Sequence, residues 1–146
     1  MKFQERNDSF YMSLALNEAK KAYKKNEVPV GCVIVKDNKV IAASHNKKEK
    51  KNIILAHAEI LAIIKASKKL HTWRLENCIL YVTLEPCAMC MAAISQSRVK
   101  KIIISSKNNK KLEEYDIIDS ITKDYGILES ESSQLLKTFF QSLRDK

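Results

Sequence analysis

Glycine and proline are scarce in this sequence, with two of each among 146 residues. A collagen-like or linker-rich chain needs many of both, so these classes are excluded. Hydrophobic residues make up 45% of the chain. At this length about two-thirds of the surface of the unfolded chain is buried on folding, so a core forms without disulfide bonds. We expect a single globular domain over residues 1–146.

Long apolar runs are also missing. No stretch of about 18 apolar residues occurs, so we expect no membrane-spanning helix. The start of the chain, Met1 to Asp8, lacks the apolar segment of a signal peptide. We therefore expect a cytoplasmic protein. Because the cytosol is reducing, the four cysteines of the chain are expected to be ligands, catalytic groups or buried thiols and not disulfides.

Arginine is rare although the chain is strongly basic. The formal net charge is +9 at pH 7, and arginine occurs only at positions 6, 74, 98 and 144. A basic surface attracts phosphates over long distances, which favours a nucleic-acid partner. Lysine, however, is a poorer bidentate phosphate ligand than arginine. A solvated lysine-rich surface therefore explains the charge about equally well.

The spacing of apolar residues predicts helices that alternate with short strands. Helices are expected over 8–25, 56–70, 86–97 and 131–144. Strands are expected over 32–35, 40–43, 79–82 and 101–105, with a last short one at 127–128. Asp37 and Asn38 form a hairpin turn, and Lys47 to Asn52 form a charged loop. The alternation is typical of an α/β domain in which helices cover a mixed sheet. The last helix is expected to turn five apolar residues inward: Leu135, Leu136, Phe139, Phe140 and Leu143.

Two short motifs carry the chemistry. His57-Ala58-Glu59 is followed, after 26 intervening residues, by Pro86-Cys87-Ala88-Met89-Cys90. Two cysteines three apart at a helix start point to one side, where the helix dipole favours thiolates. His57, Cys87 and Cys90 would leave the fourth tetrahedral position of a zinc ion open for water, as in catalytic sites. The sequence thus predicts one catalytic Zn²⁺ per chain.

Glu59 is predicted to carry protons. Two residues from His57, it cannot easily become a fourth ligand without straining the tetrahedral geometry. Deamination requires a proton to leave water, reach a ring nitrogen and finally reach the departing ammonia, and one carboxylate can do this in turn. The alternative, a buried or structural cysteine pair, accounts for Cys87 and Cys90 but not for Glu59 beside His57.

The remaining candidates favour structural roles. Cys32 and Cys78 lie in or beside apolar strands and are expected to be core thiols. His71 follows a helix and is expected at the surface or as a cap. Trp73 is interpreted as core packing in preference to a base-stacking platform. For His45, at a strand end, lining the substrate pocket is the less favoured interpretation.

At these motifs the chain resembles the bacterial tRNA adenosine deaminases of the cytidine deaminase superfamily. The H-x-E and P-C-x-x-C motifs match the established signature of zinc deaminases, which identifies only the superfamily. The tRNA branch is favoured by the turn Val28-Pro29-Val30-Gly31 and by Thr83-Leu84-Glu85 before the cysteines. The resemblance covers nearly the whole chain.

This resemblance implies a three-layer α-β-α fold with a mixed five-stranded sheet, a homodimer, and conversion of adenosine to inosine at the wobble position of a tRNA anticodon loop. Anticodon bases are already splayed, so one can enter a pocket without the opening of a duplex. The resemblance also implies substrate contacts: Asn46 to the nucleoside, the backbone N–H of Ala58 to the base, Val30 and Leu84 as pocket walls, and Phe139 closing the pocket.

The resemblance weakens after the fourth expected strand. The family usually has Gly-Ala-Arg-Asp-x-Lys-x-Gly there, whereas residues 105–112 read Ser-Ser-Lys-Asn-Asn-Lys-Lys-Leu. Lys110 is kept, Lys107 is a basic substitute, and Asn108 replaces the aspartate. We expect these three residues to meet the nucleic-acid backbone.

Two other functions fit parts of the sequence. A free-base or nucleoside deaminase of the guanine or cytosine type would use the same zinc chemistry without needing a basic surface. A non-catalytic partner subunit or nucleic-acid-binding module would need the zinc ligands at most. The presence of Glu59 counts against this second alternative.

Overall fold

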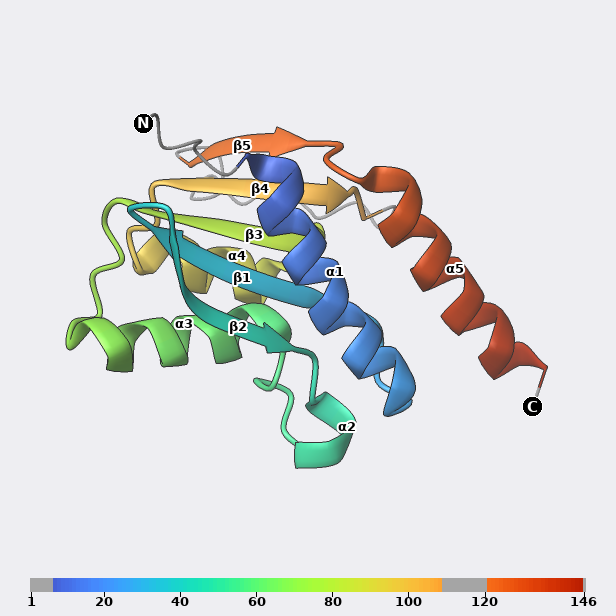
Figure 1. Cartoon of the computed structure of the whole chain (residues 1–146). Helices are drawn as coiled ribbons and strands as arrows, with labels where there is room; N and C mark the ends of the chain where they lie inside the picture. Colours follow the sequence, from blue (N-terminus) through green and yellow to red (C-terminus); the bar gives the residue numbers. More distant parts are fainter. Residues whose placement is uncertain (1–6, 109–120, 146) are drawn as a thin grey trace.

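Five strands form one mixed sheet in the order β2–β1–β3–β4–β5 (Figure 1). The structure, a computed structural model, describes residues 7–108 and 121–145. The strands are β1 Gly31–Lys36, β2 Lys39–His45, β3 Cys78–Leu84, β4 Lys101–Ser106 and β5 Thr122–Tyr125. β1 runs antiparallel to β2 and β3, whereas β3, β4 and β5 run parallel. The predicted mixed five-stranded sheet is confirmed.

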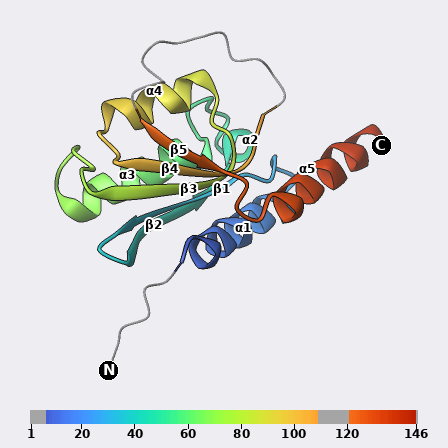
Figure 2. The ribbon, with the colours of Figure 1, turned by 90° about the horizontal axis from the view of Figure 1, so that it is seen from above.

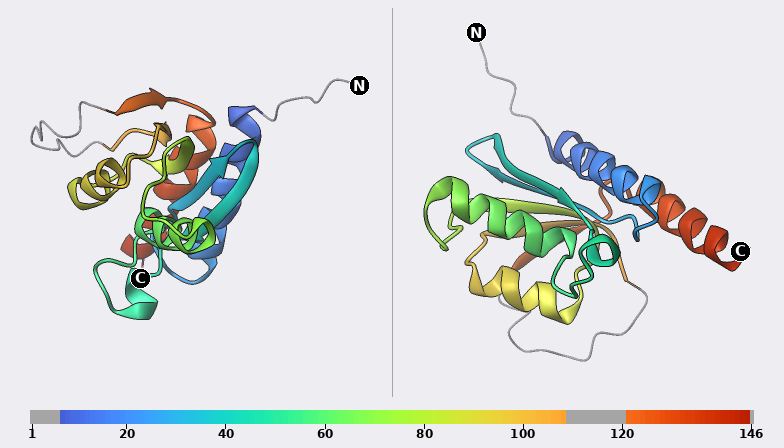
Figure 3. Two further views of the ribbon diagram at one scale, coloured as in Figure 1. Left: turned by 90° about the vertical axis from the view of Figure 1, so that its left-hand side faces the viewer. Right: turned by 90° about the horizontal axis from the view of Figure 1, so that it is seen from below.

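Helices cover both faces of this sheet (Figure 2). The helices are α1 Asp8–Lys24, α2 Lys48–Lys51, α3 Ala58–Leu70, α4 Ala88–Gln96 and α5 Glu129–Arg144. α1 and α5 lie on one face, and α3 and α4 lie on the other (Figure 2, Figure 3). This is the expected three-layer arrangement. Among the described residues, no helix is both long and apolar enough to cross a bilayer.

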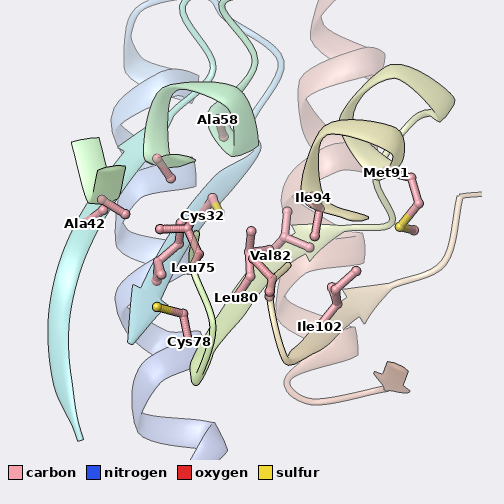
Figure 4. Close-up of a cluster of buried hydrophobic side chains, with 14 of the residues drawn as sticks. Cys32, Ala42, Ala58, Leu75, Cys78, Leu80, Val82, Met91, Ile94 and Ile102 are labelled. Atoms are coloured by element: carbon pink, nitrogen blue, oxygen red, sulfur yellow. The ribbon is translucent and has the colours of Figure 1, made fainter. Parts of the chain in front are cut away.

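The central strands are apolar on both faces because both faces are covered. Cys32, Ile34 and Leu80 belong to a buried cluster that also contains residues of α3 and α4, and Figure 4 shows most of this cluster. Val33 and Tyr81, one position along, pack against α1 on the other face. This alternation follows the two-residue period of a strand. Cys32 and Cys78 are buried free thiols, as predicted.

Gly31 lets the first strand approach α1 closely. A Cβ at this position would lie 1.9 Å from the backbone oxygen of Ala15. The Gly31 N–H donates to the buried Thr83 hydroxyl at 3.1 Å, which ties the start of β1 to the end of β3. Val30 and Leu84, the expected pocket walls, are the chain neighbours of Gly31 and Thr83, so this hydrogen bond sets how they lie relative to each other.

The β1–β2 hairpin has the predicted two-residue turn. Asp37 and Asn38 have φ values of 50° and 61°. Two consecutive left-handed residues match the right-handed twist of the strands, and Asp and Asn tolerate this conformation better than most residues.

Two predicted elements are wrong. Lys47 to Asn52 is not a loop throughout, because Lys48–Lys51 forms α2. The buried Glu27 carboxylate accepts the N–H groups of Glu49 and Lys50 at 3.0 and 2.8 Å, a contact from outside the segment. The last strand is not 127–128 but β5, a largely polar edge strand that pairs with β4. Because β5 is largely polar, the pattern of apolar residues did not predict this strand.

Some predicted residue environments are also wrong. Trp73 is 55% exposed, and the guanidinium groups of Arg74 and Arg98 lie 5.1 and 5.9 Å from its ring. Phe140 and Leu143 of α5 are exposed, although the helix contacts α1, β3 and β4. Its buried apolar residues are Leu136 and Phe139.

Candidate active site

The predicted metal ligands lie at the N-terminal ends of two neighbouring helices. His57 is the N-cap of α3 and Cys87 is the N-cap of α4, both with extended backbone. Cys90 follows in the first turn of α4. The helix therefore begins after Pro86, two residues later than the sequence indicated. Free backbone amides and the helix dipole at such ends favour negatively charged ligands.

The three side chains converge on one point. His57 Nδ1 lies 3.3 Å from Cys90 Sγ and 3.7 Å from Cys87 Sγ. All three ligand atoms lie within 4.8 Å of one another. Tetrahedral zinc, with bonds of about 2.0 Å to nitrogen and 2.3 Å to sulfur, holds its ligand atoms roughly 3.5–3.8 Å apart. The residues present therefore fit such an ion, both in donor type and in spacing.

The two thiols differ in acidity. The hydrogen bond with Cys90 lowers the pKa of Cys87 to about 5, although burial opposes this. The same hydrogen bond, together with burial, raises the pKa of Cys90 well above its ordinary value. Cys87 can thus supply a thiolate, which is the form that binds a cation.

Glu59 lies in the first turn of α3 and is 4% exposed. Burial raises its pKa to about 7, with a further rise from the charge of Cys87. A carboxyl group with a pKa near neutrality can both accept a proton and return it, which suits general acid–base catalysis. The side chain lines the same cavity as His57 and Cys87.

This cavity has a volume of about 190 Å³. Pockets for drug-sized ligands have volumes of roughly 300–1,000 Å³, so the smaller volume suits a single base. It is lined by residues from both sides of the β1–β3 junction and from the starts of α2, α3 and α4: Val28, Val30, Asn46, Lys48, His57, Ala58, Glu59, Leu84, Glu85, Cys87 and Asn108.

Four of the expected substrate residues line the cavity, namely Val30, Asn46, Ala58 and Leu84. The Asn46 side chain is held in place, because its amide donates to the Val28 carbonyl at 3.3 Å and its oxygen accepts the Lys48 N–H at 3.1 Å. Their contacts with substrate stay predictions.

Phe139 is not among the lining residues, in contrast to its expected role in closing the pocket. It is buried, and its ring packs edge-on against Tyr23 of α1, with 5.8 Å between ring centroids. Phe139 lies here because the apolar face of α5 is directed toward α1. His45 also faces α1, and its Nδ1 lies 2.9 Å from Glu18 Oε1.

Three lining residues escaped the sequence analysis: Val28, Lys48 and Glu85. Glu85 accepts the Asn108 N–H at 3.0 Å and the Tyr125 hydroxyl at 3.1 Å, so it joins the ends of β3, β4 and β5. Its place beside Pro86-Cys87 was a usable signal. Val28 opens the turn Val28-Pro29-Val30-Gly31, which was also a usable signal, whereas no local pattern pointed to Lys48.

The divergent segment is described only in part. Asn108 lines the cavity, and the exposed Lys107 places its ammonium group 5.0 Å from the ring centroid of Tyr125. Lys110, expected to meet the nucleic acid, lies outside the described residues.

Comparison with known proteins agrees with this geometry. A family model of MafB19-like deaminases matches residues 6–144. The chain is 43% identical to a tRNA-specific adenosine deaminase of Bacillus subtilis (strain 168), covering 95% of this chain and 92% of that protein. It is also 43% identical to one of Aquifex aeolicus (strain VF5), covering 93% and 95%.

Solved structures show the same similarity. One comes from a study of A-to-I editing by deaminases at the wobble position of transfer RNA. It has a TM-score of 0.82 and 39% identity, covering 88% of this chain and 99% of that one. A guanine deaminase from Bacillus subtilis has a TM-score of 0.67 and 36% identity, covering 70% and 66%.

Proposed function

Because the chain belongs to the MafB19-like deaminase family and, within it, to the tRNA-specific adenosine deaminases, we propose that it converts adenosine to inosine at the wobble position of tRNA with a zinc ion held by His57, Cys87 and Cys90. The observation that carries this proposal is the convergence of the three ligand atoms beside the buried Glu59 in one base-sized cavity.

The zinc ion and Glu59 have separate roles in this proposal. When bound, zinc acts as a Lewis acid and lowers the pKa of water toward about 7. The Glu59 carboxylate takes a proton from the water and delivers it to the ring nitrogen beside the reacting carbon. It then passes the second proton of the water to the amino group, which leaves as ammonia. The water oxygen stays on the base, so adenosine and water give inosine and ammonia.

The cavity walls would orient the base. The backbone N–H of Ala58, at the start of α3, would donate to the base, and Asn46 would hold the nucleoside. Val30 and Leu84 would contact the two faces of the ring. Bases of an anticodon loop are already unpaired, so little unpairing energy opposes their entry into such a pocket.

We further propose that two copies of this chain form a homodimer. Ile53, Ile54 and Leu55 are consecutive, each more than half exposed, and they directly precede the site. Ile64 adds an exposed apolar side chain on α3. Contiguous exposed apolar residues mark interaction surfaces. We propose that each copy works as one domain over residues 1–146 and acts in the cytoplasm, where tRNA is found.

The substrate is tested directly by product analysis. Purified protein is incubated with a tRNA that carries adenosine at the wobble position, and in parallel with free adenosine, guanine and cytidine. We expect inosine in the tRNA and no product from the free compounds. The similarity to a guanine deaminase makes guanine the relevant competitor. Release of ammonia from guanine with an unchanged tRNA would replace our proposal with the free-base alternative.

A further inference from the structure

Six lysines lie on or near α2, next to the cavity. α2 contributes three of them, Lys47 precedes it, Lys25 ends α1, and Lys65 lies on α3. We call them the α2 lysine patch: Lys25, Lys47, Lys48, Lys50, Lys51 and Lys65. Figures 1 and 3 show α2 beside the C-terminal end of α1 and the N-terminal end of α3. Lys48 also lines the cavity, so the patch and the site are continuous.

Buried polar groups fix the backbone that carries this patch. The Glu27 side chain is 1% exposed, and its two oxygens accept the N–H groups of Glu49 and Lys50. The Asn46 oxygen accepts the N–H of Lys48. The short helix is therefore anchored from below, while Lys50 and Lys51 are exposed. Such anchoring holds the backbone that carries the charged side chains beside the cavity.

Apart from the buried Glu27 carboxylate beneath α2, the patch has few partners of opposite charge. Among residues 7–108 and 121–145, its one ion-pair contact is Lys48 with the exposed Glu49, at 3.9 Å. Elsewhere Lys21 pairs with Glu18, and Lys101 with Asp124, both at 2.7 Å. Burial and the neighbouring lysine charges lower the pKa of Lys47. A polyanion would relieve this mutual repulsion.

Among the described residues, the opposite side of the cavity offers less to an anion. Glu85 lines that side, and its carboxylate is turned to the Asn108 N–H and the Tyr125 hydroxyl. The Lys107 ammonium group is placed over the ring of Tyr125. A negatively charged strand that enters the cavity would therefore be drawn toward α2 and away from Glu85.

We infer that the α2 lysine patch binds the phosphodiester backbone of the RNA next to the adenosine that enters the cavity. This inference rests on the proposed function and deepens it, because it assigns the phosphate contacts to one side of the cavity. Each phosphate that a lysine neutralises releases counterions, so binding becomes salt-dependent. The ligand is the unpaired loop of the anticodon arm.

Two triple variants with the same change in charge test this inference. Lys25, Lys50 and Lys51 are replaced by Gln in the first. Lys39, Lys68 and Lys69 are replaced by Gln in the control; these exposed lysines lie at the other end of the sheet, on the β1–β2 hairpin and the end of α3. The dissociation constant for an anticodon stem–loop with a wobble adenosine is measured across KCl concentrations.

We expect the patch variant to weaken binding about tenfold at low salt, and to flatten the log–log salt slope by about 2, since each lost phosphate contact on a single strand contributes roughly 0.7. The control should stay within about twofold of wild type. Thermal unfolding and zinc content verify that both variants fold.

The outcomes separate the patch from the proposed function. If wild type deaminates the stem–loop but the patch variant keeps its affinity and slope, the inference is overturned and the function stands. Equal weakening by the control would also overturn it, because general surface charge would then be responsible. If wild type binds the stem–loop without deaminating it, the function fails, and the comparison of affinities still decides the role of the patch.

Discussion

At the scale of single residues, two carboxylates in the cavity do different work. Both oxygens of Glu85 accept hydrogen bonds from neighbouring segments, which makes it a positioning residue for the cavity wall. Glu59 is buried beside the cysteines, and that burial raises its pKa to about 7. A group that must take up and release protons in one cycle needs a pKa near neutrality, and burial of this kind provides it.

Replacing Glu59 by Ala should abolish deamination while the protein keeps its zinc and its fold. Glu59 lies outside the ligand set, and a general acid–base group typically contributes about 10² to 10⁴-fold. Because one carboxylate serves several proton transfers in the proposed mechanism, we expect the upper end of this range. Single-turnover rates and metal analysis are the measurements. Near-normal turnover would assign the proton transfers to another group.

Replacing Cys87 by Ala should remove zinc and lower the unfolding temperature. Zinc binding contributes to folding free energy, so loss of a ligand destabilises the folded chain. The control is Cys78→Ala, at a buried thiol outside the ligand set, which should keep its metal. Metal analysis measures the zinc content of both variants, and thermal unfolding measures their stability. A fully active protein that contains no metal would refute the zinc proposal.

Asn108 bears on the choice between RNA and DNA. The sequence resemblance implies an aspartate at this position, and a carboxylate could repel a misplaced phosphate and accept a hydrogen bond from the ribose 2′-OH. Asparagine removes the repulsion but keeps an acceptor oxygen. In this protein Asn108 lines the cavity beside Glu85. We therefore propose that this enzyme separates RNA from DNA less sharply than its relatives.

The variant Asn108→Asp should raise the ratio of deamination rates on matched RNA and DNA anticodon hairpins. Wild-type protein and Lys107→Gln, which changes the preceding residue, serve as references. An unchanged ratio would mean that position 108 has drifted without a role in discrimination.

At the scale of elements, the site depends on how tightly β1 packs on α1. Gly31 lies at this contact, directly after Val30, and its N–H is bound by Thr83 next to Leu84. Any side chain there meets backbone atoms, which cannot rotate aside. The substrate cavity is therefore built on a close approach of two elements far from the metal motif in sequence.

Gly31→Ala should destabilise the protein by about 1–3 kcal/mol or more, because overpacking forces backbone shifts. The added Cβ would lie 1.9 Å from the Ala15 oxygen and 2.6 Å from the Ala19 nitrogen. Denaturant unfolding measures the loss. As a control, Ala43→Gly in the neighbouring β2 also changes one methyl group but adds no contact, and should cost less. Wild-type stability in Gly31→Ala would show that α1 can move away.

At the scale of the whole molecule, exposed apolar residues gather on the side that carries α3. Ile53, Ile54 and Leu55 connect α2 to α3, and Ile64 lies on α3 itself. They adjoin both His57 and the α2 lysine patch. A second copy bound there would place two cavities and two basic patches in one assembly, which would enlarge the surface open to a tRNA.

Ile54→Asp should convert the proposed dimer into a monomer, because a charge buried in an apolar interface lacks a partner. Light scattering at micromolar concentration measures the mass. Leu143→Asp, at an exposed leucine on α5 at the opposite face, is the matched control and should leave the assembly unchanged. A monomeric wild type, or a dimer that survives Ile54→Asp, would contradict the proposed interface.

The sequence by itself determined the candidate metal ligands, the candidate proton carrier and the buried strands. His57, Glu59, Cys87 and Cys90 could be identified because each motif is a few residues long, and its geometry is set by the start of one helix. The central strands could be identified because burial on both faces demands a continuous apolar run. Both signals are local.

Only the tertiary structure decided the rest. α2 exists because the Glu27 carboxylate, about twenty positions away, satisfies two of its N–H groups. Glu85 and Asn108 line the cavity, and the hydrogen bonds of Glu85 with Asn108 and Tyr125 join three strand ends. Phe139 packs on α1 and not on the cavity, since the neighbours of a helix, and not its own periodicity, decide where its apolar face is buried. Contacts between distant segments leave no pattern in the order of the residues.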